Sequence, residues 1–263
     1  MDIEIQGKQA HAATGGCREN AGEPAVVFVH GAGMNRTAWQ LQARNVAHNG
    51  RRVFAVDLPG HGRSQGPPLR SITEMADWLA LFMEASETGP ATIIGHSMGA
   101  LVALEVAARH HSNLTKLLLI GVAENMPVHP DLLAAANANQ PLGPKLIVFW
   151  GLGSASQIGG HLQPGFWVHG ASETLLKSSK LGVLGNDLTA SNSYQDSLKA
   201  AAKISCPVKL ILSADDKMTA VKSGVALGKA ISNASIDIIS NCGHMIMLER
   251  PEEVYKSMKD FVF

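Results

Sequence analysis

The chain has 263 residues, of which 46% are hydrophobic and 17% are charged, with 22 basic and 22 acidic side chains. This composition is typical of a folded globular protein and excludes a disordered one. The formal net charge of +0 favours neither nucleic acid nor an acidic membrane surface as a partner. A chain of this length fits one α/β domain with an insertion.

The lack of a predicted signal peptide or membrane span, together with the cysteine pattern, favours a cytoplasmic location. Residues Met1–Ile5 do not form a basic segment followed by an apolar one, so we expect no signal peptide. No apolar run is long enough to predict a membrane span. The three cysteines, Cys17, Cys206 and Cys242, are odd in number and lack metal-ligand spacing, which favours a reducing compartment. For Cys242 the pattern favours a small buried side chain over a reactive thiol.

In chain order, the hydrophobic pattern predicts strands that alternate with helices. The predicted strands are two in 2–13, joined near Gly7, and single ones at 25–29, 52–56, 91–94, 114–120, 206–212 and 236–239. The predicted helices are one that ends near 49–50, then 71–85, 98–111, 220–231 and a last one from Pro251. The first two strands suit an antiparallel edge hairpin. The later strands are mostly continuous apolar runs, so we expect a mainly parallel sheet covered on both faces.

The alternation of strands and helices breaks between residues 121 and 202. This segment is rich in small residues and contains Trp150, Phe166 and Trp167 within or beside a glycine-dense stretch. A structureless loop of this length is unusual in a compact domain, so we expect a helical cap inserted over one edge of the sheet. We expect at least two of the three aromatic side chains to be buried in the cap, the alternative being that they line a pocket.

The stretch Gly95-His-Ser-Met-Gly99 follows a predicted strand and precedes a predicted helix. A G-x-S-x-G at such a corner is the layout of a nucleophile elbow, which would make Ser97 a nucleophile. The alternative is that Ser97 is only the N-cap of the helix. The flanking strand and helix favour the nucleophile.

A serine nucleophile needs a base, and the base needs a group that orients it. Of the 11 histidines, His244 follows the last strand and lies at the same sheet edge as Ser97. His96 is adjacent to Ser97, but neighbouring residues on an elbow point apart. Asp215 and Asp216 follow the preceding strand, so the order is Ser, Asp, His, as in nucleophile-elbow hydrolases. One of the two aspartates can instead open the next helix.

Two other interpretations of the glycine-rich segments are disfavoured, a dinucleotide-binding site and a P-loop. Gly31-x-Gly33 follows a strand, as in a dinucleotide-binding fingerprint, but Arg36 holds the position of the third glycine. The glycine-rich segments also lack the Gly-Lys-Ser/Thr ending of a P-loop.

Taken together, five motifs resemble those of the α/β-hydrolase superfamily over nearly the full chain outside the cap. They are His30-Gly-Ala-Gly33, Asp57-Leu-Pro-Gly-His-Gly-Arg-Ser64, Gly95-His-Ser-Met-Gly99, Ser213-Ala-Asp-Asp216 and Gly243-His244. The resemblance implies a three-layer αβα sandwich with a mostly parallel eight-stranded sheet. It divides the chain into a core, residues 1–122 and 203–263, and an inserted cap, residues 123–202.

The resemblance also implies roles for single residues. The family's acid motif points to Asp216 rather than Asp215, although Ser213 replaces its glycine and Ala220 its proline. Some members place the acid after the strand that follows the elbow helix, which leaves Glu124 as an alternative. The backbone N–H groups of Ala32 and Met98 match the oxyanion hole. No metal or organic cofactor is implied.

The expected activity is therefore hydrolysis of a small or medium carboxylic ester with an apolar acyl or alcohol part. Ser97 would be the nucleophile, His244 the base and Asp216 the orienting acid. Lactonases, thioesterases, carbon–carbon bond hydrolases, cofactor-free perhydrolases and acyl transferases share this pattern and stay open. So does a ligand receptor on the same scaffold. Family members with an aspartate nucleophile, the dehalogenases and epoxide hydrolases, are disfavoured by Ser97. The oligomeric state is not predicted.

Overall fold

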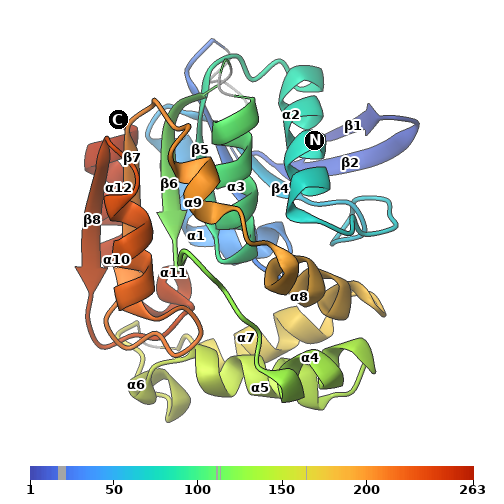
Figure 1. The fold of residues 1–263 in the computed structure, drawn as a ribbon, viewed down its shortest axis with the longest axis vertical. Helices are drawn as coiled ribbons and strands as arrows, with labels where there is room; N and C mark the ends of the chain where they lie inside the picture. The colour runs from blue at the N-terminus through green and yellow to red at the C-terminus, as the bar shows by residue number, and fades with distance from the viewer. Residues whose placement is uncertain (17–21, 111, 113, 164) are drawn as a thin grey trace.

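A computed structural model describes residues 1–16, 22–110, 112, 114–163 and 165–263. Cys17 and His111, named above, lie outside the described residues. The molecule is a three-layer sandwich in which helices cover both faces of one sheet (Figure 1). The expected fold class is confirmed.

The sheet has eight strands in the order β1-β2-β4-β3-β5-β6-β7-β8. They are β1 (Asp2–Ile5), β2 (Lys8–Ala13), β3 (Ala25–Val29), β4 (Arg52–Asp57), β5 (Ala91–His96), β6 (Leu114–Ile120), β7 (Val208–Ser213) and β8 (Ala234–Ile239). The first two strands pair antiparallel at one edge, and the pairs from β4 to β8 are parallel. The parallel strands therefore end at one edge of the sheet, where an open α/β sheet binds ligands.

Alternate side chains of the central strands enter two separate cores. In β3, Val27 and Val29 belong to the core beneath α2, α3 and α10, whereas Val26 and Phe28 belong to the core beneath α1 and α12. This two-sided burial explains why the strand is an unbroken apolar run. The core helices are η1 (Arg36–Trp39), α1 (Gln40–His48), α2 (Ile72–Ala85), α3 (Met98–Arg109), α10 (Val221–Lys229), α11 (Ile246–Glu249) and α12 (Pro251–Val262).

The start of α2 shows how local chemistry sets a helix boundary. The side chain of Ser71 accepts a hydrogen bond from the backbone N–H of Glu74, at 3.1 Å. The Glu74 carboxylate reaches back to the N–H of Arg70, at 2.7 Å, one residue before the usual partner in a capping box. The short helix α11 was not predicted, because its four residues are too few to show a helical period.

Between β6 and β7, the described residues form six helices. They are α4 (Pro130–Asn137), α5 (Leu142–Gly151), α6 (Ser154–Gln157), α7 (Val168–Lys177), α8 (Val183–Ser193) and α9 (Ser197–Ala201). Helices α4 to α8 lie beyond the carboxyl ends of the parallel strands (Figure 1). Helix α9 returns to the core, since Ala200 and Ala201 join the cluster that contains α3. The insertion thus closes the sheet edge at which Ser97 lies.

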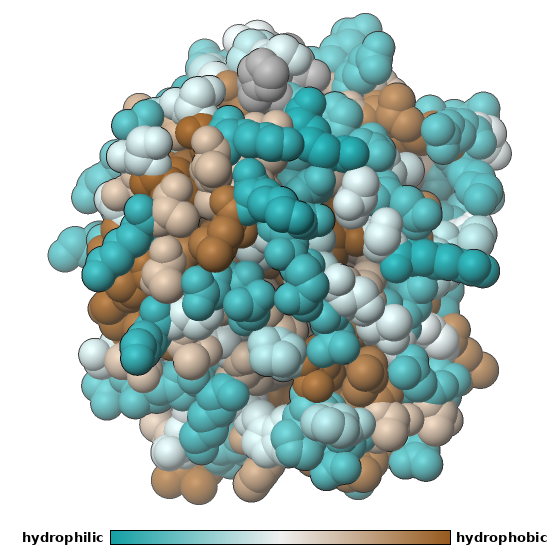
Figure 2. Space-filling view, viewed as in Figure 1, coloured by the Kyte–Doolittle hydropathy of each residue, from teal (hydrophilic) through white to brown (hydrophobic). Residues whose placement is uncertain are grey.

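The surface is mixed in polarity. On the face drawn in Figure 2, hydrophilic side chains predominate and hydrophobic ones form small separate groups, several of them along the lower edge occupied by the cap. In the part of the chain that the structure describes, no helix combines the length and apolar character needed to cross a bilayer.

Candidate active site

Ser97 occupies a sharp corner between β5 and α3. Its φ and ψ angles are 54° and −120°, a conformation that costs a residue other than glycine about 1–3 kcal/mol. The corner is held by hydrogen bonds from Ser97 N–H to the carbonyl of Ile120, at 2.9 Å, and from Ala100 N–H to the carbonyl of Ser97, at 2.9 Å. The side chain of Ser97 makes no capping hydrogen bond. Ser97 therefore stands at the N-cap position of α3, but its side chain does not cap the helix.

The two glycines of the motif are required by close backbone contacts. A Cβ atom on Gly95 would collide with the backbone carbonyl of Gly99, and one on Gly99 would collide with the carbonyls of Val29 and His30. Any larger residue at either position would push α3 away from β5 or β3. The G-x-S-x-G pattern is thus a direct consequence of how tightly the helix packs against the sheet.

A cavity of about 600 Å³ opens above the corner. Ser97, His244 and Ala32 all line it, so the structure brings three of the predicted site residues together. Ser97 is only 1% exposed. Its Oγ is buried and has no hydrogen-bond partner among the described residues. An unpartnered buried hydroxyl is unusual, and here it faces a cavity that can hold a substrate.

His244 and Asp216 form a buried pair. The Nδ1 atom of His244 lies 2.8 Å from Oδ2 of Asp216, and the two residues are 2% and 8% exposed. Because a carboxylate only accepts, His244 donates from Nδ1, which in the neutral ring leaves the lone pair on Nε2. This tautomer is the one a general base needs.

Asp216 stays ionised over the physiological pH range. Burial raises its pKa, but the neighbouring His244 and the hydrogen bonds from His244 and Thr219 outweigh burial and lower the pKa to about 2. Its Oδ1 atom accepts from the backbone N–H groups of Met218 and Thr219, both at 2.8 Å. The Thr219 hydroxyl donates to Oδ2 at 2.6 Å. With its oxygens held in this way, Asp216 can fix the orientation of the His244 ring.

The segment His30–Gly33, predicted to carry one oxyanion donor, follows β3. Nδ1 of His30 donates to the carbonyl of Gly31 at 2.9 Å, and Nε2 accepts from the N–H of Leu58 at 3.2 Å. Burial and the nearby His61 lower the pKa of His30 to about 4, so the ring is neutral. Met98, the other predicted donor, is the first residue of α3 and is fully buried.

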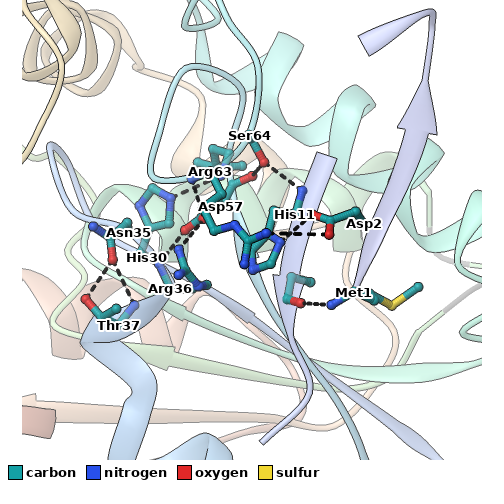
Figure 3. Close-up of polar contacts among 12 residues, drawn as sticks. Met1, Asp2, His11, His30, Asn35, Arg36, Thr37, Asp57, Arg63 and Ser64 are labelled. Carbon is teal, nitrogen blue, oxygen red and sulfur yellow. Dashed lines mark hydrogen bonds and ion pairs between the residues drawn. The ribbon is translucent and has the colours of Figure 1, made fainter. Parts of the chain in front are cut away.

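The loop that follows β4 is organised by Asp57, which is completely buried. Its carboxylate accepts hydrogen bonds from Arg36 N–H at 2.8 Å, from Arg36 Nη1 at 2.7 Å and from Arg63 N–H at 2.9 Å (Figure 3). The Ser64 hydroxyl donates to the carbonyl of Asp57 at 2.6 Å and accepts from the N–H of His11. This motif is therefore structural: it shapes the loop that supports His30.

Comparison with known proteins agrees with this geometry. A model of the alpha/beta hydrolase family matches residues 26–257. The chain belongs to the alpha/beta hydrolase family. It is 27% identical to a pimeloyl-[acyl-carrier protein] methyl ester esterase of Aromatoleum aromaticum, over 91% of this chain and 98% of that protein. It is 21% identical to an (E)-2-((N-methylformamido)methylene)succinate hydrolase of Acinetobacter baylyi, over 92% and 90% of the two chains.

Among solved structures, the enol-lactonase from Burkholderia xenovorans LB400 superposes with a TM-score of 0.86. It covers 99% of both chains at 19% sequence identity, and at that identity the likeness concerns the fold alone.

In this alpha/beta hydrolase, the carboxylate bonded to the His244 ring is that of Asp216. Asp215 is exposed and accepts from the N–H of Asn241 at 3.0 Å. Glu124 is half-buried, and its N–H donates to the carbonyl of Ser223 at 3.4 Å. Within the described residues, neither of these two carboxylates has a hydrogen bond to His244, so the geometry favours Asp216 among the three candidates.

Two residues of this alpha/beta hydrolase contact the His–Asp pair and were not identified from the sequence. The Thr219 hydroxyl lies 3.2 Å from His244 Nδ1 as well as bonding Asp216. His96 donates from Nε2 to the carbonyl of His244 at 2.9 Å. Burial and, to a smaller extent, the nearby His244 lower the pKa of His96 to about 3. The position of Thr219, three residues after Asp216, is the signal that could have found it. No sequence signal relates His96 to a backbone carbonyl 148 residues away.

The prediction for the cap aromatics was partly wrong. Trp150 is half-buried and lines the cavity, and Phe166 is half-buried against the core. Trp167 is 65% exposed. None of the three is therefore fully buried in the cap. In the described part of the chain, no cluster of three or more histidine, cysteine or acidic side chains could hold a metal ion.

Proposed function

We propose that this protein is a serine hydrolase that cleaves a small or medium carboxylic ester through an acyl-enzyme. One observation carries the proposal. The buried hydroxyl of Ser97, which no described residue bonds, shares a cavity with His244, and Nδ1 of His244 is hydrogen-bonded to the buried carboxylate of Asp216. The names of the relatives, an esterase and a hydrolase, agree with ester cleavage.

The reaction follows from the protonation states. Ser97 Oγ attacks the ester carbonyl while His244 Nε2 takes its proton, and the oxyanion of the tetrahedral intermediate accepts hydrogen bonds from the N–H groups of Ala32 and Met98. His244 then protonates the leaving alcohol, and the acyl group remains on Ser97. Water, deprotonated by His244, attacks the acyl-enzyme and releases the acid. Asp216 stabilises the imidazolium without taking its proton.

The cavity indicates a substrate with an apolar part. More than half of the residues that line it are apolar, namely Ala32, Met126, Pro127, Val128, Pro130, Leu132, Trp150, Leu188, Met218 and Ala220. Lactones, thioesters and carbon–carbon bonds next to carbonyls would meet the same groups and remain alternative substrates. The alternative of another class is a ligand receptor that retains the site without turnover. We also propose a cytoplasmic location, because Cys206 and Cys242 are unpaired thiols.

The direct test is turnover of p-nitrophenyl acetate and butyrate by the purified protein, together with labelling by a fluorophosphonate. We expect release of p-nitrophenol and one covalent adduct, located by mass spectrometry on the peptide that contains Ser97. An absence of both turnover and labelling would favour the receptor alternative. Labelling at another residue would reject Ser97 as the nucleophile.

The identity of the acid gives a second prediction. The Asp216→Asn variant should lose about 10⁴-fold in kcat, because an amide cannot hold the same His244 tautomer and cannot stabilise the imidazolium. Asp215→Asn and Glu124→Gln are the matched controls and should stay within a few-fold of wild type. Steady-state kinetics with p-nitrophenyl butyrate measure all three, and a larger loss in either control would move the assignment.

The mouth of the cavity gives a prediction about substrate charge. Lys217 lines the cavity and is exposed, and among the described residues that line it none is acidic. The Acinetobacter baylyi relative is named for a succinate derivative. We therefore expect Lys217→Gln to raise KM for mono-p-nitrophenyl glutarate about two- to fivefold, the range of an exposed ion pair. KM for the neutral p-nitrophenyl pentanoate, of equal chain length, should not change. Equal changes for both esters would contradict a charge contact.

A further inference from the structure

A second buried ion pair lies near the candidate site, and the proposed chemistry does not use it. His61, in the loop after β4, places its Nε2 atom 2.7 Å from Oδ2 of Asp187, in the cap helix α8. The side chains are 1% and 0% exposed. The pair joins the core to the cap across 126 positions of sequence.

The hydrogen bonds define the charge of this pair. Both ring nitrogens of His61 face acceptors, since Nδ1 lies 3.1 Å from the carbonyl of Pro59 and Nε2 faces the Asp187 carboxylate. Both nitrogens therefore donate, and the ring is an imidazolium. Burial lowers the pKa of His61, but the charge and hydrogen bond of Asp187 outweigh burial and raise the pKa above its usual value. A buried charge is tolerated only when it is paired in this way.

The same carboxylate oxygen holds the segment after β3. Oδ2 of Asp187 accepts a second hydrogen bond from the backbone N–H of Gly33, at 2.8 Å. Helix α8 also packs directly on this glycine, because a Cβ atom there would lie 2.6 Å from Cδ1 of Leu184. Gly33 immediately follows Ala32, whose N–H is the proposed oxyanion donor. Asp187 thus fixes one of the two peptide groups that flank Ala32.

The other flanking peptide is fixed from the core. The carbonyl of Gly31 accepts from His30 Nδ1 at 2.9 Å and from Met34 N–H at 3.2 Å. In a planar trans peptide, the N–H of Ala32 points opposite to the carbonyl of Gly31. Holding that carbonyl and the next N–H therefore sets the direction of the Ala32 N–H.

We propose that Asp187 and His61 are positioning residues for the hydrolysis reaction: from the cap, they hold the segment Gly31–Gly33 in the shape that aims the Ala32 N–H at the oxyanion. This inference rests on the proposed function. It adds that the cap, besides covering the cavity, completes the oxyanion hole. His61 provides the buried hydrogen bond that keeps the Asp187 carboxylate oriented towards Gly33.

The test compares Asp187→Asn with a matched control, Lys180→Met. Lys180 also joins the cap to the loop of His61, through a 3.2 Å hydrogen bond from Nζ to the carbonyl of Ser64, but it does not bond to the Gly31–Gly33 segment. We expect Asp187→Asn to lower kcat by about tenfold to a hundredfold with KM nearly unchanged, because misplacing a catalytic group by about 1 Å has that effect. Lys180→Met should stay within twofold of wild type.

A transition-state analogue separates positioning from general loosening of the cap. An aliphatic trifluoromethyl ketone adds Ser97 at its carbonyl carbon, and its oxygen becomes an oxyanion in the hole. Its Ki should rise in Asp187→Asn by the same factor as kcat/KM falls. If kcat of the folded Asp187→Asn variant stays within twofold of wild type, or if Lys180→Met loses as much, the proposal is overturned.

Hydrogen exchange gives a readout that does not depend on activity. The Gly33 amide should exchange slowly in the wild-type protein and at least tenfold faster in Asp187→Asn. Fast exchange in the wild type would overturn the proposal even if no variant folds. If Asp187→Asn does not fold, His61→Gln replaces it, and we expect a smaller loss of kcat. A kcat of the His61→Gln variant equal to that of the wild type would again overturn the proposal. Slow exchange of the Gly33 amide without any esterase turnover would instead reject the proposed function, while the hydrogen bond from Gly33 to Asp187 would still be supported.

Discussion

Replacing Ser97 with alanine is expected to lower kcat for p-nitrophenyl esters by about 10⁶-fold, the loss seen when a nucleophile that acts as a unit with its base is removed. The stability of the folded protein should not decrease. The Ser97 hydroxyl makes no hydrogen bond within the described residues, so its removal leaves no partner unsatisfied. Alanine therefore removes no hydrogen bond between protein groups and keeps the side chain small enough for the elbow.

The Ser97→Ala variant should therefore show a Tm equal to or higher than that of the wild type, together with loss of fluorophosphonate labelling. Differential scanning calorimetry and labelling on the same preparations measure the two effects. A variant that loses activity and also unfolds at a lower temperature would indicate that Ser97 is needed for structure. Activity above about 1% of wild type would indicate that another group is the nucleophile.

The His244→Ala variant is expected to lose about as much kcat as Ser97→Ala, because the serine hydroxyl is then left without a base. The matched control is His96→Ala. The His96 ring lies tilted against the His244 ring, with ring centroids 4.8 Å apart, and donates to the backbone carbonyl of His244. Its pKa of about 3 keeps it neutral and its Nδ1 has no partner within the described residues, so it is suited to hold His244 in place rather than to exchange protons.

We expect His96→Ala to keep a measurable part of the activity, with a loss of about tenfold to a hundredfold from a displaced base. Single-turnover kinetics with p-nitrophenyl acetate distinguish the two variants, since both acylation and deacylation need His244. A larger loss in His96→Ala than in His244→Ala would exchange the two roles. A His244→Ala variant close to wild type would reject the base assignment.

The parts of the fold that were predicted correctly have local causes. The apolar run Ala25–Val29 became β3 because both faces of the strand are buried, and Ser71 capped α2 through a contact three residues away. Ser97, Asp216 and His244 could be proposed as one site from the sequence because each follows a strand, and parallel strands end at one edge of the sheet.

The cap was the segment least predictable from sequence. Its helices are short and pack against several partners at once, so an apolar residue can face the core, the cavity or solvent without a helical period. Trp150 lines the cavity while Trp167 is exposed, and their side chains are chemically identical. Packing against neighbours from distant parts of the chain decides between such positions.

The amino-acid sequence alone is enough to specify Gly95, because a Cβ atom there would meet the backbone of Gly99 and Ala100 across a strand and a helix joined by a single residue. The requirement for Gly99 is tertiary, because it comes from the carbonyls of Val29 and His30 at the end of the neighbouring strand β3. The support around the elbow is different. The hydrogen bond from the N–H of Gly33 to Asp187 joins residues 154 positions apart. The sequence around neither residue contains a motif that indicates the other. It forms only because α8 packs over the end of β3, and a buried carboxylate there must find a positive partner and backbone donors.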